Sequence, residues 1–223
     1  MAGPVSVAVL GGTGDLGGGF ARFLLRQGAR VIIGSRDAER ARAAARELSS
    51  EFPNAPTVLG ESLAEAAAAA ELVVVTVPYA AHRATLDAVR DVVQGKLLLD
   101  ATVPLRPPKV LRVQLPAAGS AAVEGQQLLG EGVRIVAALH NIAASHLAAG
   151  TLPDCDVLVT GDKEADRQVI VDLLEAGGLR AWHAGPLANS AAAEALTSIL
   201  IGINKRYGIH GAGIRITGTP QSG

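Results

Sequence analysis

Short apolar runs alternate with segments whose apolar residues recur at helical spacing along most of the chain. The runs are almost continuously apolar, as expected for strands of a sheet that helices cover on both faces. This alternation of strand and helix predicts an α/β fold with a doubly wound, mostly parallel sheet. The runs that predict strands lie at residues 5–10, 30–34, 71–77, 96–102, 134–139, 156–161 and 180–185.

Two stretches depart from this alternation. Residues 104–122 are rich in proline and small residues, which predicts a long loop beside the carboxyl edge of the sheet. Residues 187–218 predict one apolar helix, a glycine-rich turn and a last short strand. We therefore expect a main domain over residues 1–186 and a small C-terminal segment over residues 187–223.

Composition narrows the class of protein. The chain has 223 residues, of which 49% are hydrophobic and 18% charged, so a well-filled core is expected. A net charge of −1 and an aromatic content of 3% argue against binding to nucleic acid. The single cysteine, Cys155, excludes an internal disulfide and favours a reducing compartment. With no secretory signal pattern and no membrane-spanning run in the sequence, we expect a soluble, cytoplasmic protein.

A glycine motif follows the first predicted strand and opens a helix. It fits G-x-G-x-x-G, the fingerprint of a Rossmann-type dinucleotide-binding fold, in the strand-to-helix context that this fingerprint requires. A glycine-rich turn without a ligand is the alternative interpretation. A P-loop is excluded, because no Gly-Lys-Ser/Thr follows the glycines. The residues of the motif are Gly12, Thr13, Gly14, Asp15, Leu16 and Gly17.

The end of the second strand distinguishes NADP from NAD. An NAD-binding chain places Asp or Glu there to bind the ribose hydroxyls. This chain instead has Ser35 and Arg36, with Arg40 one helical turn further on, and these groups suit a 2′-phosphate. Asp37 lies past the usual position and is expected to cap the next helix. The sequence therefore predicts NADP(H), unless Ser35 is only a cap and the arginines are only solvated surface.

Two further strand ends arrive at the same edge of the predicted sheet. Val77-Pro78 and Ala101-Thr102 are candidates to line the ribose and nicotinamide of the nucleotide, because ligands of doubly wound sheets bind at this edge. Pro78 has the simpler alternative role of starting a helix.

The usual acid and base groups are hard to find. No cluster of His, Asp or Glu has metal-ligand spacing, so we expect no metal, and no catalytic residue is assigned. His140, at the end of a predicted strand, is a candidate site residue, with a packing or loop role as the alternative. Direct hydride transfer between two bound cofactors suits these few groups best, because it depends on positioning.

Several segments together resemble one family. The segments "GGTGDLGGGFA", "VIIGSRDAERA", "VAALHNI" and "RYGIHGAGIRITG" occur in the order typical of NADPH-dependent F420 reductases, and the resemblance covers nearly the whole chain. It implies hydride transfer between NADPH and C5 of the deazaflavin coenzyme F420, in a cleft that the C-terminal segment completes. It further implies NADP contacts at Thr13, Ser35, Arg36, Arg40 and Val77-Pro78, and a deazaflavin side at His140 and Ile142.

Other functions stay open. A related NADP-dependent reductase of imines, flavin or ferric iron is one alternative, although imine reductases normally need a larger helical domain. A non-catalytic NADP(H) sensor is another. The apolar helix predicted at residues 190–203 has little polar face, which indicates burial and favours a homodimer.

Overall fold

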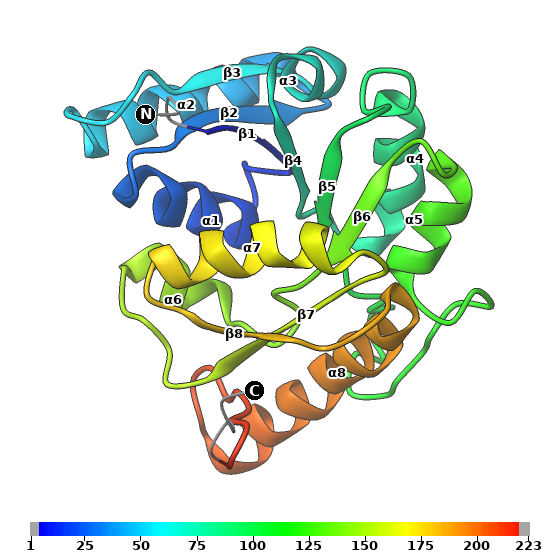
Figure 1. Cartoon of the computed structure of the whole chain (residues 1–223). Coiled ribbons are helices and arrows are strands. Elements are labelled where there is room, and N and C mark those ends of the chain that lie inside the picture. The colour runs from blue at the N-terminus through cyan, green and yellow to red at the C-terminus, as the bar shows by residue number, and fades with distance from the viewer. Residues whose placement is uncertain (1–4, 219–223) are drawn as a thin grey trace.

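The computed structural model describes residues 5–218, and this part of the chain forms eight β-strands, eight α-helices and one 3-10 helix (Figure 1). The strands are β1 Ser6–Leu10, β2 Arg30–Ser35, β3 Leu59–Ser62, β4 Leu72–Val75, β5 Leu97–Asp100, β6 Arg134–Ala137, β7 Asp156–Gly161 and β8 Arg180–His183. The helices are α1 Asp15–Arg26, α2 Ala38–Glu51, α3 Leu63–Ala69, α4 Tyr79–Val89, α5 Ala121–Leu129, α6 Ala144–Ala149, α7 Glu164–Ala176, the 3-10 helix η1 Leu187–Asn189 and α8 Ser190–Tyr207. Within residues 5–218, none of these helices is long and apolar enough to cross a membrane.

All eight strands join one sheet in the order β3-β2-β1-β4-β5-β6-β7-β8. Every neighbouring pair is parallel except β6 and β7, which are antiparallel. The predicted doubly wound, mostly parallel α/β sheet is thus confirmed. The chain runs outward from β1 in one direction and returns to place β4 on its other side. The topological switch point therefore lies between the carboxyl ends of β1 and β4, where sheets of this kind bind ligands.

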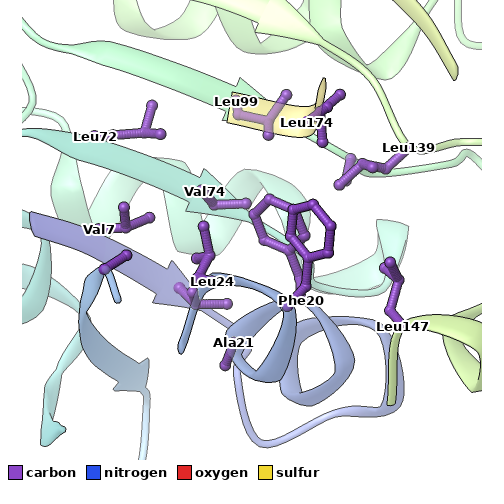
Figure 2. Packing of buried hydrophobic residues seen from close by; sticks show 14 of the residues in the cluster. Val7, Phe20, Ala21, Leu24, Leu72, Val74, Leu99, Leu139, Leu147 and Leu174 are labelled. Carbon is purple, nitrogen blue, oxygen red and sulfur yellow. The ribbon is translucent and has the colours of Figure 1, made fainter. Parts of the chain in front are cut away.

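Different helices cover the two faces of the sheet. Residues of α1, α2, α6 and α7 belong to the core on one face, and residues of α3, α4 and α5 to the core on the other. The central strands serve both cores: Val7 and Val9 of β1 face the first, Ala8 and Leu10 the second. Figure 2 shows the first core, with Phe20 of α1 among side chains of the central strands. Burial on both faces explains the continuous apolar runs in the sequence.

Two short elements, β3 and α6, were not expected from the sequence, and one expected strand does not form. Strand β3 lies at the edge of the sheet and half of its four residues are polar, and α6 has only six residues, so neither produces a clear hydrophobic pattern. The expected last strand near the C-terminus is wrong. There, Asp156 donates its N–H to the carbonyl of Ile214, but the N–H of Ile216 binds the Asp156 side chain at 2.7 Å, so no ladder continues.

The other irregular regions follow the expectation more closely. The stretch from residue 101 to Ser120 contains no helix or strand, which confirms the predicted loop up to the start of α5. The predicted apolar helix is α8, and it extends to Tyr207. The expected domain boundary at residue 186 falls directly before η1, while residues 1–4 and 219–223 at the ends of the two expected parts lie outside the described residues.

Two glycine substitutions should change stability in opposite directions. A Cβ at Gly60 of β3 would collide with the backbone of Ala41 and Arg42 in α2, so Gly60→Ala should cost about 1–3 kcal/mol. Gly202 lies inside α8 with nothing within 4 Å of an added Cβ, so Gly202→Ala should stabilise by roughly 0.5–1 kcal/mol. Thermal unfolding followed by circular dichroism measures both. Equal effects of the two substitutions would contradict the packing of β3 on α2.

Candidate functional site

The loop after β1 leads into the N-terminus of α1 beside the switch point. Gly11 has a φ of 89°, in the left-handed region, and its carbonyl accepts from the N–H of Gly14 at 2.9 Å. Helix α1 then begins at Asp15 without a side-chain cap. A side chain at Gly17 would collide with the Gly11 carbonyl, which follows β1, and with the Thr76 hydroxyl, which follows β4. Glycine at this position therefore lets α1 start close to the ends of β1 and β4. The uncapped start of α1 is a favourable position for a phosphate group.

The segment after β2 leaves two cations unpaired. Asp37 is the N-cap of α2, and its carboxylate accepts from the N–H groups of Glu39 and Arg40 at 3.0 and 3.2 Å. The predicted capping role of Asp37 is confirmed. The Ser35 hydroxyl accepts from the Asp37 N–H at 3.2 Å. The side chains of Arg36 and Arg40 are exposed, and neither makes an ion pair or hydrogen bond with another residue in the described part of the chain.

One cavity connects these two segments with the end of β4. Its volume is about 490 Å³. The predicted site residues that line it are Thr13 and Gly14 from the loop, Ser35, Arg36 and Arg40 after β2, and Val77 and Pro78 after β4. Pro78 is also the N-cap of α4, which confirms its alternative role of starting a helix, while its role toward a nucleotide stays a prediction. The cavity therefore joins the glycine loop after β1 to the two unpaired guanidinium groups.

The remaining predicted contacts lie outside this cavity. Gly12 and Asp15 line a neighbouring cavity of about 450 Å³ between α1, α2 and α6. Leu16 and Gly17 belong to the first turn of α1, where Gly17 is buried. Ala101 and Thr102 are buried directly after β5 and do not line either cavity.

The predicted deazaflavin-side residues lie where β6 ends. Leu139 turns the chain there with a φ of 73°, a strained conformation of the kind that occurs at functional sites. His140 and Ile142 follow and are both buried. The backbone carbonyl of His140 accepts from the Thr197 hydroxyl at 2.6 Å. Burial lowers the pKa of His140 to about 4, although the negative charge of Asp100 acts in the other direction and raises it. The imidazole of His140 is therefore neutral at neutral pH.

Two neighbouring strand ends carry buried polar side chains. Both ring nitrogens of His140 are buried and have no hydrogen-bond partner among the described residues, whereas the buried hydroxyl of Thr102 lies beside the Asp100 carboxylate and helps to lower its pKa. Strands β5 and β6 are paired, so these two residues follow adjacent strands at the carboxyl edge. Buried polar groups in folded proteins are nearly always hydrogen-bonded, so atoms without a partner indicate a place where a ligand or water supplies the partner.

The sequence analysis overlooked a buried charged cluster beside these atoms. His82 of α4 lies with its Nε2 2.7 Å from Oδ2 of Asp100, the last residue of β5. Glu194 of α8 accepts from the N–H groups of Ala121 and Ala122 at 2.7 and 3.2 Å. The sequence offered two signals of this cluster: a charged residue at the end of an apolar strand and a single Glu within an apolar helix. Neither signal identifies the residue that the charged group contacts.

The three groups of this cluster affect one another electrostatically. Burial favours neutral forms of His82 and Asp100, but their mutual attraction and hydrogen bond raise the pKa of His82 and lower that of Asp100. Each group thus favours the charged form of the other. Burial, together with the nearby Asp100 charge, raises the pKa of Glu194 to about 8, although the hydrogen bonds from the two backbone N–H groups lower it.

The other titratable candidates offer less chemistry. Cys155 is buried, and burial together with the acidic neighbours Asp156 and Asp154 raises the pKa of its thiol. Within residues 5–218 there is no group of three or more His, Cys, Asp or Glu side chains that could hold a metal ion. The site can thus bind phosphate groups and position rings.

The residues present fit a dinucleotide that carries a 2′-phosphate. Glycine at position 17 opens the start of α1 for the diphosphate, and the exposed cations after β2 have no protein partner to compete with a phosphate. The carboxylate that would serve NAD in this region, Asp37, is occupied by its capping bonds.

Comparison with known proteins identifies the family. The family model described as NADP oxidoreductase coenzyme F420-dependent matches residues 6–104. The chain is 42% identical to the F420-dependent NADP reductase of Methanothermobacter thermautotrophicus, over 97% of both chains. It is 35% identical to the F420-dependent NADP reductase of Methanocaldococcus jannaschii, over 96% of this chain and 98% of the relative.

A solved structure agrees over the same extent. The crystal structure of an Arthrobacter sp. FB24 protein, provisionally named an F420-dependent NADP-reductase, matches with a TM-score of 0.80 and 27% identity, over 96% of this chain and 99% of that chain. The matches extend through the loop after β1, the segment after β2 and the C-terminal helix. The chain therefore belongs to the family of F420-dependent NADP reductases.

Proposed function

We infer that this protein is an oxidoreductase that catalyses direct hydride transfer between NADPH and coenzyme F420. The observation that carries this conclusion is the cavity that joins the glycine loop to Ser35, Arg36 and Arg40 in a chain of this family. When bound, NADPH supplies a hydride and the deazaflavin accepts it at C5. Hydride transfer between two cofactors needs no protein nucleophile, because the cofactors carry the chemistry and the protein binds and orients them.

The chain's own residues bind and orient the nucleotide. In this proposal the N–H groups of Thr13 and of the first turn of α1 bind the diphosphate, as the open start of α1 favours. Ser35, Arg36 and Arg40 bind the 2′-phosphate. Gly12, Asp15, Leu16 and Gly17 shape the loop, and Val77, Pro78, Ala101 and Thr102 lie along the path toward the nicotinamide.

The deazaflavin is proposed to bind at the end of β6. His140 and Ile142 follow the strained Leu139, and the neutral imidazole of His140 has both ring nitrogens free for a ligand. Helix α8 binds this turn through the hydrogen bond of Thr197 to His140. We therefore propose that residues 187–223 complete the cleft beside a nucleotide-binding domain over residues 1–186.

We also propose a homodimer that works in the cytoplasm. Ile199 of α8 is 52% exposed, and Tyr207 and Ile209 at the end of this helix are exposed as well. Large exposed apolar side chains on and just after one helix favour an interface between copies. The single cysteine is a free, buried thiol, as suits a reducing compartment.

The activity is tested directly by the change in the visible absorption of F420. Purified protein with NADPH should bleach the visible absorption of F420, and NADH should be a much poorer donor because it lacks the 2′-phosphate. Free flavin, pyrroline-carboxylate and ferric iron serve as alternative acceptors. Turnover of one of these with none of F420 would favour a related reductase, and tight NADP binding without any acceptor would favour a sensor.

Removal of one cation should erase the preference for NADPH. We expect Arg36→Ala to lose about 1.5–3 kcal/mol of this preference, the value of a hydrogen bond to a charged group. The ratio of kcat/KM for NADPH and NADH measures it. Arg46→Ala is the matched control, because Arg46 is an exposed cation of α2 that does not line the cavity. An unmodified protein that uses both nucleotides equally would contradict the phosphate assignment.

The homodimer is tested by introducing a charge at Ile199, an exposed position in the middle of α8. Ile199→Glu should convert the dimer to a monomer, because it would place a carboxylate in an apolar interface. Sedimentation velocity measures the change. Val169→Glu on α7 is the control, since Val169 is exposed to a similar extent on a different helix. A wild-type protein that sediments as a monomer would refute the proposal.

A further inference from the structure

Asp37 organises the backbone of the segment that follows β2. One oxygen of its carboxylate, Oδ1, accepts from the N–H groups of Glu39 and Arg40 at 3.0 and 3.2 Å. Its carbonyl accepts from the N–H of Ala41 at 3.1 Å, and its own N–H donates to the Ser35 hydroxyl at 3.2 Å. Four hydrogen bonds of one residue therefore fix the chain between the end of β2 and the first turn of α2.

The same segment forms one side of the cavity beside the glycine loop. Ser35, Arg36, Asp37 and Arg40 all line this cavity of about 490 Å³. Arg36 directly precedes the cap, and Arg40 follows it in the first turn of α2. The position of one cation relative to the other therefore depends on how the chain turns at Asp37.

The neighbouring carboxylates leave these two cations free. Asp37 lies between Arg36 and Arg40 in the sequence, yet it makes no ion pair with either of them among residues 5–218. Its Oδ1 is engaged by the backbone of α2 instead. The Glu39 carboxylate pairs with Arg42 at 2.5 Å. The capping bonds thus direct the Asp37 carboxylate toward the helix backbone and leave both guanidinium groups available to an anion.

The Ser35 hydroxyl keeps a hydrogen that it can donate. Its oxygen accepts from the Asp37 N–H, and it donates to no other group in the described part of the chain. A hydroxyl has one hydrogen to donate, and the oxygens of a phosphate dianion only accept. The bond from Asp37 therefore prepares Ser35 to donate to a phosphate that lies beside Arg36 and Arg40.

We propose that Asp37 is the positioning residue of the 2′-phosphate site. Its hydrogen bonds hold Ser35, Arg36 and Arg40 in the arrangement that surrounds a phosphate, and they keep its own charge from pairing with the two cations. This inference rests on the proposed function, in which these three residues bind the 2′-phosphate. Asp37 acts through them and does not bind the phosphate itself, because both groups are negatively charged.

The test separates the cap from the charge, because their effects on phosphate binding have opposite signs. NADP+ and NAD+ differ only in the 2′-phosphate, and calorimetry gives both affinities. Asp37→Ala removes the cap and the charge together. Loss of the charge alone would favour the phosphate, so weaker binding reports the lost cap. We expect Asp37→Ala to weaken NADP+ binding about three- to thirtyfold, the effect of losing an N-cap, and to leave NAD+ binding unchanged.

Asp37→Asn is the conservative variant. Asparagine caps helices as well as aspartate does, so the cap remains while the negative charge beside the phosphate is removed. This variant should bind NADP+ at least as tightly as the unmodified protein.

Ser62→Ala is the matched control for a lost cap. Ser62 is the N-cap of α3, its hydroxyl accepts from the Glu65 N–H at 3.4 Å, and it does not line the cavity. Ser62→Ala should lower the midpoint of thermal unfolding, as Asp37→Ala does, but leave the preference for NADP+ over NAD+ unchanged. The same measurement shows that each variant is folded before it is titrated.

Three results would overturn the inference while the unmodified protein still prefers NADP+. They are normal NADP+ binding by Asp37→Ala, equal weakening of both nucleotides by Asp37→Ala, and a loss in Asp37→Asn as large as that in Asp37→Ala. An unmodified protein that binds the two nucleotides equally would overturn the proposed phosphate site, and this inference with it. No F420 is present in the experiment, so the identity of the hydride acceptor does not affect the outcome.

Discussion

Helix α1 starts within contact distance of β1 and β4, and residue 17 has no side chain that would prevent it. The carbonyl of Gly11 and the hydroxyl of Thr76 occupy the space that a Cβ at this position would need. Because of this approach, the uncapped N-terminus of α1 lies at the switch point of the sheet. This one contact therefore determines where the cavity between the glycine loop and the cations after β2 lies.

The helix also meets α6 through its glycines. A Cβ at Gly19 would come within 2.9 Å of the carbonyl of Ala144, so the glycine run allows close packing on α6 as well as on the strands. Helix α6 follows directly after the turn that carries His140 and Ile142. The same glycine-rich helix therefore supports the nucleotide loop at its start and the proposed deazaflavin side one turn later.

Local patterns in the sequence were sufficient to predict the main strands and to select residues that the fold brings together around one cavity. Both faces of the central strands are buried, so their composition is distinctive, and the glycine motif and Ser35-Arg36 are contiguous in the chain. Strand β3 and helix α6 are too short for their periodicity to be seen. The contact of His82 with Asp100 spans 18 residues and that of Glu194 with α5 spans more than 70, so packing in three dimensions, and no local pattern, brings them together.

The antiparallel pairing of β6 and β7 changes the shape of the sheet at its carboxyl edge. Ala137 is opposite Thr160, so Asp156 at the start of β7 lies beyond the end of β6, where the amide of Asn141 donates to its carbonyl at 2.6 Å. The outer two strands thus overhang the edge as a side wall, and the C-terminal tail attaches to this wall through Asp156. The residues that line the cavity at the ends of β1, β2 and β4 come from the first 85 positions of the chain and include none from this wall or from the tail. Substitutions in the wall or tail would therefore leave the lining of that cavity unchanged.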